Sequence, residues 1–130
     1  MTFLDSSVII DLLEGAEGVV DYVESRGDPY FTSTICVFEV IEGRLGGGET
    51  DVAGVRKDFP GVKSLDLTEG IALEALRMQD RLLDDGERMA PRDILVAATA
   101  RSTGAELVVS DTDFRTRHLE DEMTVTNLAA

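Results

Sequence analysis

The sequence contains one cysteine, one histidine, two lysines and no tryptophan among 130 residues. A single cysteine, Cys36, excludes an internal disulfide and a thiolate metal centre within the chain. There is no run of 18 apolar residues, so a membrane-spanning helix is not expected. The first residues lack the basic and apolar blocks of a signal peptide. Together these absences predict a protein of the reducing cytoplasm with no membrane contact.

Positive charge is also scarce. The 26 acidic residues outnumber the 12 basic ones and give a formal net charge of −14. Such a surface repels nucleic acids and anionic membranes at low salt, so either the partner is cationic or the protein works in high salt. The acids are spread along the whole chain, which favours the high-salt interpretation, and the net charge then says little about the substrate.

Short apolar segments alternate with longer segments of helical periodicity. This alternation predicts one α/β domain, residues 1–130, with a mainly parallel central sheet between helices. Strands are expected at 2–4, 29–32, 62–66, 106–109 and 123–126. Helices are expected from a cap at Ser6 or Ser7 to 13, and at 18–25, 35–45, 51–59, 69–84 and 91–102.

Four acidic residues stand in apolar surroundings. Asp5 and Asp111 each follow an apolar strand, whereas Glu39 and Asp93 lie in helices that are apolar on most sides. Taken singly, Asp5 and Asp93 also suit helix caps and Asp111 suits a turn. Glu39 requires a partner because it lies between large apolar residues, and no buried base is evident for it.

In an open parallel sheet, binding sites gather beyond the carboxyl ends of the strands. If the four acids meet there, they repel one another and raise one another's pKa values. A hard divalent cation such as Mg²⁺ or Mn²⁺ relieves that repulsion and prefers oxygen ligands. The acids therefore predict a metal site.

Four segments, in order along the chain, resemble the PIN domain family in its short form, the VapC-type toxin ribonucleases. The segments are Leu4-Asp5-Ser6-Ser7 with the following apolar helix to Gly15, Glu39 with Gly43 four residues on, Asp93-Ile94-Leu95-Val96-Ala97-Ala98-Thr99-Ala100, and Ser110-Asp111-Thr112-Asp113-Phe114. The third segment is the most specific. Val109 departs from the pattern, because the family commonly has Thr two residues before the fourth acid.

The resemblance implies a three-layer α/β/α fold and metal-dependent hydrolysis of RNA phosphodiesters. Asp5, Glu39, Asp93 and Asp111 would be the catalytic acids around one or two Mg²⁺ or Mn²⁺ ions. Asp5, Asp93 and Asp111 would be the metal ligands. The metal would activate a water molecule and stabilise charge on the phosphate, so no protein nucleophile is required.

Other residues take supporting roles in this interpretation. Ser6 or Ser7 would hydrogen-bond a metal-bound water, and Asp113 is either a supporting residue or the fourth acid in place of Asp111. Three arginines near the acids are candidates for RNA phosphate contacts, although surface ion pairs explain them equally well: Arg92, Arg115 and Arg117. Cys36 and Phe38 are expected in the core, and His118 is expected to be a polar loop residue.

The family further implies a homodimer and a small antitoxin protein that inserts a basic side chain into the acidic site. The helices between residues 35 and 59, with a hinge at Gly46–Gly48, are the expected clip around an antitoxin helix. Two alternatives remain within the family: an RNA-processing nuclease, and a catalytically silent PIN-like binding module. A phosphatase or phospho-receiver is disfavoured because Lys57 and Lys63 lie outside the four motifs.

Overall fold

The computed structural model describes residues 1–115 and 117–129 and is built around one sheet of five parallel strands. The strands are β1 (Thr2–Leu4), β2 (Tyr30–Ser33), β3 (Val62–Leu65), β4 (Glu106–Val109) and β5 (Val125–Asn127), in the order β3-β2-β1-β4-β5. In the centre, β1 pairs with β2 on one side and with β4 on the other. The expected parallel sheet is confirmed, and it is parallel throughout.

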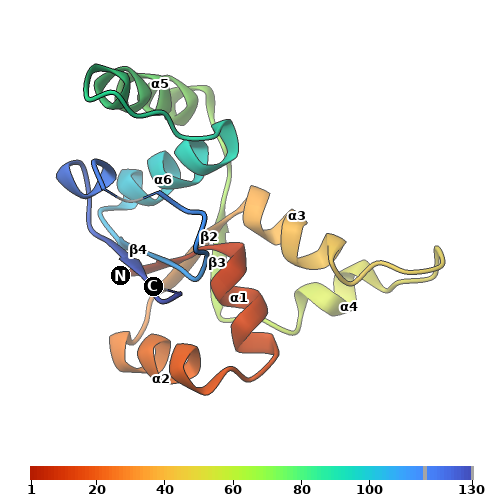
Figure 1. Cartoon of the computed structure of the whole chain (residues 1–130). Helices are drawn as coiled ribbons and strands as arrows, with labels where there is room; N and C mark the ends of the chain where they lie inside the picture. The colour runs from red at the N-terminus through yellow and green to blue at the C-terminus, as the bar shows by residue number, and fades with distance from the viewer. Residues whose placement is uncertain (116, 130) are drawn as a thin grey trace.

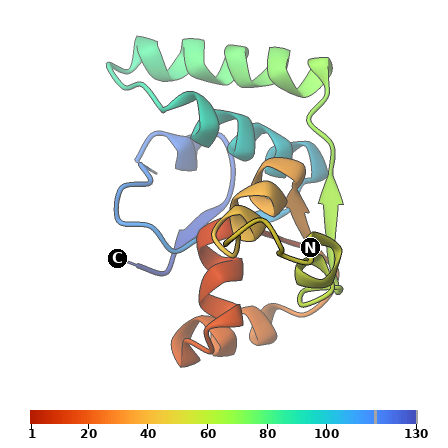
Figure 2. The ribbon, with the colours of Figure 1, turned by 90° about the vertical axis from the view of Figure 1, so that its right-hand side faces the viewer.

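Helices cover both faces of this sheet. They are α1 (Ser6–Leu13), α2 (Glu17–Arg26), α3 (Thr34–Glu42), α4 (Val52–Arg56), α5 (Glu69–Asp84) and α6 (Pro91–Thr103), followed by a 3₁₀ turn at Leu119–Asp121. Figures 1 and 2 show α5 and α6 on one face and α1 and α2 on the other, while α3 and α4 extend to one side. The three-layer α/β/α arrangement is therefore confirmed. In the described part of the chain, no helix is long and apolar enough to cross a membrane.

Side chains of β1 and β4 alternate between the two faces, as strand geometry requires. Phe3 and Leu107 pack into the core under α5 and α6, whereas Leu4 and Val108 pack into the core on the opposite face. All four are fully buried. Both central strands are apolar on both faces, as is usual for a parallel sheet covered by helices.

Some expected details were wrong. The helix expected at 35–45 ends at Glu42 because Gly43 terminates it, and the helix expected at 51–59 is only the single turn Val52–Arg56. Phe38, expected in the core, is 62% exposed, whereas Cys36 is buried as expected. The apolar positions of α3 are so continuous that periodicity alone could not show which side faces outward.

Polar contacts join α2 to strands β4 and β5. The Tyr22 hydroxyl and the Thr126 hydroxyl each donate a hydrogen bond of 2.6 Å to Glu106 Oε2, and Arg26 Nε lies 3.1 Å from Glu106 Oε1. Burial alone would raise the pKa of Glu106, but the hydrogen bonds from Thr126 and Tyr22 and the charge of Arg26 lower it below its ordinary value. The ionised form of Glu106 is thus stabilised by folding.

This network predicts part of the acid sensitivity of the fold. Because the pKa of Glu106 is lower in the folded state, its contribution to stability is present above its unfolded pKa and is lost as pH falls through the folded value. Glu106→Gln should therefore be less stable than the wild type near pH 7 and lose less stability on acidification. Urea unfolding at a series of pH values measures this, and equal pH slopes in the two proteins would contradict it.

Candidate active site

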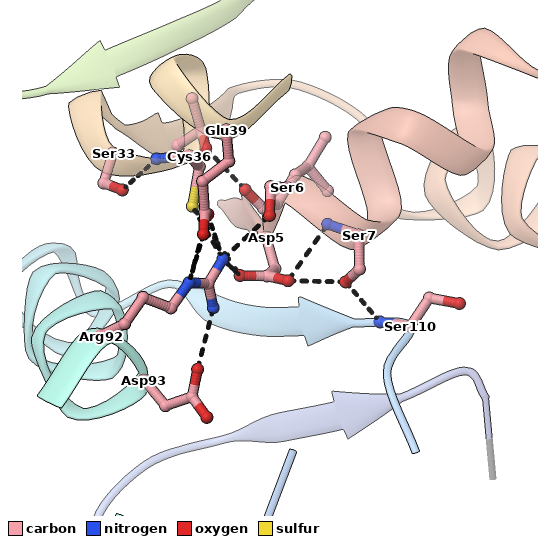
Figure 3. A network of polar contacts seen from close by, with 11 residues as sticks. Asp5, Ser6, Ser7, Ser33, Cys36, Glu39, Arg92, Asp93 and Ser110 are labelled. Atoms are coloured by element: carbon pink, nitrogen blue, oxygen red, sulfur yellow. Dashed lines mark hydrogen bonds and ion pairs between the residues drawn. The ribbon is translucent and has the colours of Figure 1, made fainter. Parts of the chain in front are cut away.

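Three of the four predicted acids meet around one arginine where the central strands end (Figure 3). Asp5 directly follows β1, Glu39 lies on α3, and Asp93 lies in the first turn of α6. Arg92, also from the first turn of α6, extends its guanidinium between them. Side chains separated by up to 88 positions in the sequence therefore share one site.

Asp5 is the most buried of the acids, with 1% of its surface exposed. It is the N-cap of α1, and its Oδ2 accepts hydrogen bonds from the Ser7 amide at 3.1 Å and the Ser7 hydroxyl at 2.6 Å. The capping role considered for Asp5 is thus real. It uses one carboxylate oxygen and leaves Oδ1 directed toward Arg92, at 2.8 Å from Nη2.

The Arg92 guanidinium contacts all three carboxylates. Its Nε donates to Glu39 Oε2 at 3.0 Å, its Nη2 donates to Glu39 Oε1 at 2.5 Å, and its Nη1 donates to Asp93 Oδ1 at 3.1 Å. The two hydrogen bonds to Glu39 form the bidentate arrangement for which a planar guanidinium is suited. Glu39 is half-buried, and Arg92 is the basic partner that its apolar neighbours led us to expect. It does not act as a surface ion pair, because 72% of its side chain is covered.

Electrostatics within the site follow from this arrangement. Burial alone would lower the pKa of the Arg92 guanidinium, but the hydrogen bonds that it donates to Glu39 and the charge of Asp5 raise this pKa above its ordinary value. The pKa of Asp93 is raised, mainly by burial and also by the charges of Asp5 and Asp111, even though Arg92 acts in the opposite direction. Burial therefore outweighs the arginine partner and makes the ionised form of Asp93 less favourable than that of a carboxyl group in water.

Asp111 lies beside this group at the end of β4. Its backbone is held by Asn127, whose side-chain oxygen accepts from the Asp111 amide at 3.3 Å and whose side-chain nitrogen donates to the Asp111 carbonyl at 2.8 Å. Asp111 Oδ1 accepts a hydrogen bond from the Asp113 amide at 2.9 Å, whereas Asp113 itself is exposed. The effect of Asp111 on the pKa of Asp93 places its carboxylate in the electrostatic field of the site.

Two serines connect the acids to the sheet. The Ser6 hydroxyl is 2.9 Å from Arg92 Nη2 and accepts its hydrogen bond. The Ser7 hydroxyl donates to Asp5 and accepts from the Ser110 amide at 2.9 Å, so it joins the end of β1 to the end of β4. Ser110 in turn donates to Asp11 Oδ2 on α1 at 2.8 Å. Both predicted serines are therefore at the site, in contact with its charged groups.

The remaining predicted residues lie elsewhere. Arg115 and Arg117 are exposed in the loop after β4. His118 lies within 4 Å of carboxylate oxygens of Asp85, Glu87 and Asp121, between the α5–α6 loop and the 3₁₀ turn. It is a loop residue as expected, although acidic side chains surround it on several sides.

Sequence reasoning missed the central position of Arg92 and the contribution of Asn127. Glu39 needed a buried base, and Arg92 is the basic residue next to a predicted site acid, so combining these two observations would have suggested the pair. For Asn127 no sequence signal was available, because its role depends on β5 pairing with β4 at that register.

The chemistry of these side chains suits a hard divalent cation. Carboxylate oxygens are the donors that Mg²⁺ and Mn²⁺ prefer, and Asp5, Glu39 and Asp93 bring three carboxylates to one guanidinium. Asp5, Asp93 and Asp111 offer donors of this chemistry, and Arg92 lies between Asp5 and Asp93. Among the described residues, the group of three whose ligand atoms lie within 4.8 Å of one another is instead Asp85, His118 and Asp121.

The fold of the chain is shared by solved structures of other proteins. FitAcB from Neisseria gonorrhoeae is similar in structure, with 25% sequence identity, a TM-score of 0.78 and coverage of 98% of this chain and 97% of that one. DNA-bound VapBC from Salmonella typhimurium shares the fold at 22% identity and a TM-score of 0.72, over 98% of each chain. A toxin-antitoxin complex from Klebsiella pneumoniae shares it at 18% identity and a TM-score of 0.72, over 88% of this chain and 89% of that one.

No curated protein sequence matches the chain significantly. The family model described as PIN domain matches residues 2–118, which include all four predicted acids and the whole sheet except β5. Because this match spans nearly the whole chain, and the fold and order of motifs agree with it, the protein belongs to the PIN domain family.

Proposed function

We propose that the protein is a Mg²⁺- or Mn²⁺-dependent endoribonuclease and the toxin of a type II toxin-antitoxin pair. The observation that carries this proposal is the convergence of Asp5, Glu39 and Asp93, with Asp111 beside them, in a chain of the PIN domain family. Repulsion within a group of acids this dense at the ends of parallel strands destabilises the fold unless the group binds a cation.

Each residue of the site has a role in this reaction. Asp5, Asp93 and Asp111 would hold the divalent ion, which when bound lowers the pKa of water and stabilises negative charge on a phosphate. Ser7 fixes the orientation of Asp5 by two hydrogen bonds. Glu39 lies on the opposite side of Arg92 from Asp93, and both of its oxygens accept hydrogen bonds from the guanidinium, which it orients.

RNA binding needs positive charge near the acids. Arg115 and Arg117 are exposed in the loop that follows Asp111, and we assign them to contacts with substrate phosphates. The overall charge of −14 opposes RNA binding at low salt, so activity is expected to require salt that screens this charge.

The antitoxin partner is supported by the apolar residues exposed around α3 and α4. Phe38, Leu45 and Val52 are 62%, 56% and 52% exposed, and they lie on the segment expected to clasp an antitoxin helix. The similar structures include a toxin-antitoxin complex and DNA-bound VapBC. We place the protein in the cytoplasm, as a homodimer whose acidic site receives a basic side chain of the antitoxin.

One observation favours a second candidate, a PIN-like binding module without activity. Arg92 already neutralises part of the acidic charge, and a permanent ion pair of this kind requires no metal. An RNA-processing nuclease without an antitoxin would use the same site. The metal and mutation tests below separate the silent module from both nucleases, and antitoxin binding separates the two nucleases.

Removing one proposed metal ligand tests the reaction. Asp93→Asn should lower RNA cleavage at high salt by about a hundredfold or more, and chelation of divalent ions should abolish cleavage by the wild type. Because the ionised form of Asp93 is unfavourable in the metal-free fold, the variant should be at least as stable as the wild type. Thermal unfolding of the chelated proteins checks that point.

Asp21→Asn, an exposed position on α2, is the matched control for this experiment and should cleave like the wild type. Cleavage that survives chelation, or that survives Asp93→Asn, would contradict the proposed mechanism. Equal loss in the control variant would mean that the assay reports charge or folding and not the site.

The choice between Asp111 and Asp113 is testable in the same assay. Asp111→Asn should reduce cleavage strongly, because it removes a carboxylate in the field of Asp93. Asp113→Asn should leave most of the activity, because the Asp113 amide, which donates to Asp111, is unaffected by the substitution. The opposite order of effects would assign the fourth acid to Asp113.

Antitoxin binding should depend on the exposed aromatic side chain of α3. Phe38→Ala should weaken the complex with the antitoxin by about tenfold or more, since buried aromatic residues are common binding hot spots. Titration calorimetry with the co-purified partner measures the change. Leu83→Ala, 48% exposed on α5, is the control and should bind normally. Normal binding by Phe38→Ala would contradict the proposal that the helices between residues 35 and 59 clasp an antitoxin helix.

A further inference from the structure

Arg92 holds the same carboxylate oxygens that the proposed metal ion needs. Its Nη2 lies 2.8 Å from Asp5 Oδ1, and its Nη1 lies 3.1 Å from Asp93 Oδ1. The other oxygen of Asp5 already accepts two hydrogen bonds from Ser7, so Oδ1 is the atom left for an ion. Figure 3 shows the guanidinium in the space between the two aspartates.

A divalent ion and this guanidinium exclude each other. An ion such as Mg²⁺ is held about 2.1 Å from its oxygen ligands, and an ion that bridges these two oxygens would occupy the space that the guanidinium now fills. The two positive charges also repel at such a separation. Arg92 must therefore leave Asp5 and Asp93 before an ion can be bound by both.

The contacts of the Arg92 guanidinium allow it to move away from Asp5 and Asp93. Among the described residues, its hydrogen bonds and ion pairs are all with side chains, namely those of Asp5, Ser6, Cys36, Glu39 and Asp93. Arg56 provides a contrast, because its guanidinium donates to the backbone carbonyls of Phe59 and Val62 and so fixes the chain after α4. Moving the Arg92 side chain breaks no main-chain contact of this kind.

The charges in the site favour replacement of the Arg92 guanidinium by a divalent ion. Arg92 brings one positive charge to a group of three carboxylates, those of Asp5, Glu39 and Asp93. The site therefore remains short of positive charge when Arg92 is in place. A divalent ion supplies more positive charge than the guanidinium does, at the cost of displacing it.

We propose that Arg92 is a built-in competitor of the divalent cation, occupying the metal-free site and moving away from Asp5 and Asp93 when the ion binds. This inference rests on the proposed metal-dependent function and adds to it a threshold concentration of the ion, below which Arg92 occupies the site. Arg92 stabilises the acidic cluster when the ion is scarce, and the apparent affinity for the ion is lowered by the fraction of molecules in which Arg92 is bound.

Metal binding by the purified, metal-free full-length chain tests the proposal without any activity measurement. Electron paramagnetic resonance of free Mn²⁺ gives the dissociation constants of the wild type, Arg92→Gln and Arg77→Gln. Arg92→Gln should bind Mn²⁺ about tenfold or more tightly than the wild type. Arg77→Gln removes the same charge from an exposed pair on α5 and should bind like the wild type.

Arg92→Lys covers the case in which Arg92→Gln fails to fold. Lysine keeps the charge but cannot bridge three carboxylates, so it should compete less and bind Mn²⁺ more tightly than the wild type does. Equal or weaker binding by the folded variants would overturn the competition while leaving the metal site in place. Absence of Mn²⁺ binding in all proteins would overturn both the competition and the proposed function.

Nuclear magnetic resonance supplies a direct readout of Arg92. The side-chain Nε–H signal, assigned by its loss in Arg92→Gln, should shift or disappear during titration with diamagnetic Mg²⁺, because the guanidinium leaves two of its partners. The midpoint should coincide with Mg²⁺ binding measured by calorimetry. A signal that is unchanged at saturating Mg²⁺ would overturn the proposal, since Arg92 would then remain in place beside the ion.

Discussion

Repulsion between carboxylates is the force that the rest of this site is arranged to balance. The parallel sheet brings Asp5 and Asp111 to neighbouring strand ends, and α3 and α6 add Glu39 and Asp93 to the same region. Each acid would be tolerated alone, but together they need positive charge or hydrogen-bond donors. The guanidinium of Arg92, the Ser7 hydroxyl and the positive amino ends of α1 and α6 supply these.

The fold and the site are joined by contacts that serve both. The Ser7 hydroxyl donates a hydrogen bond to Asp5, the N-cap of α1, and at the same time accepts one from the backbone after β4. Asn127 ties the backbone of Asp111 to β5. Because β1 and β4 are buried on both faces, the strand ends that carry the acids are set on a rigid support. Such support keeps like charges close together when they would otherwise separate.

Much of the fold could be predicted from sequence, because alternating apolar strands and capped helices have few alternative arrangements. The four acids were identifiable from their apolar neighbours, and three of them share Arg92. The side chains that complete the site were harder to predict. Arg92 was considered only as a phosphate contact or a surface pair, because its position depends on how α6 approaches α3. Phe38 was assigned to the core because a helix that is apolar all round does not show its outer face.

The placement of β1 has a consequence for synthesis of the protein on the ribosome. The first strand of the chain is the central strand of the sheet, and its neighbour β4 begins at residue 106. The end of β1 that carries Asp5 lacks one of its two neighbouring strands until β4 has emerged, since long-range strand pairing needs both partners. A nascent chain therefore carries no assembled acidic site until β4 has been synthesised.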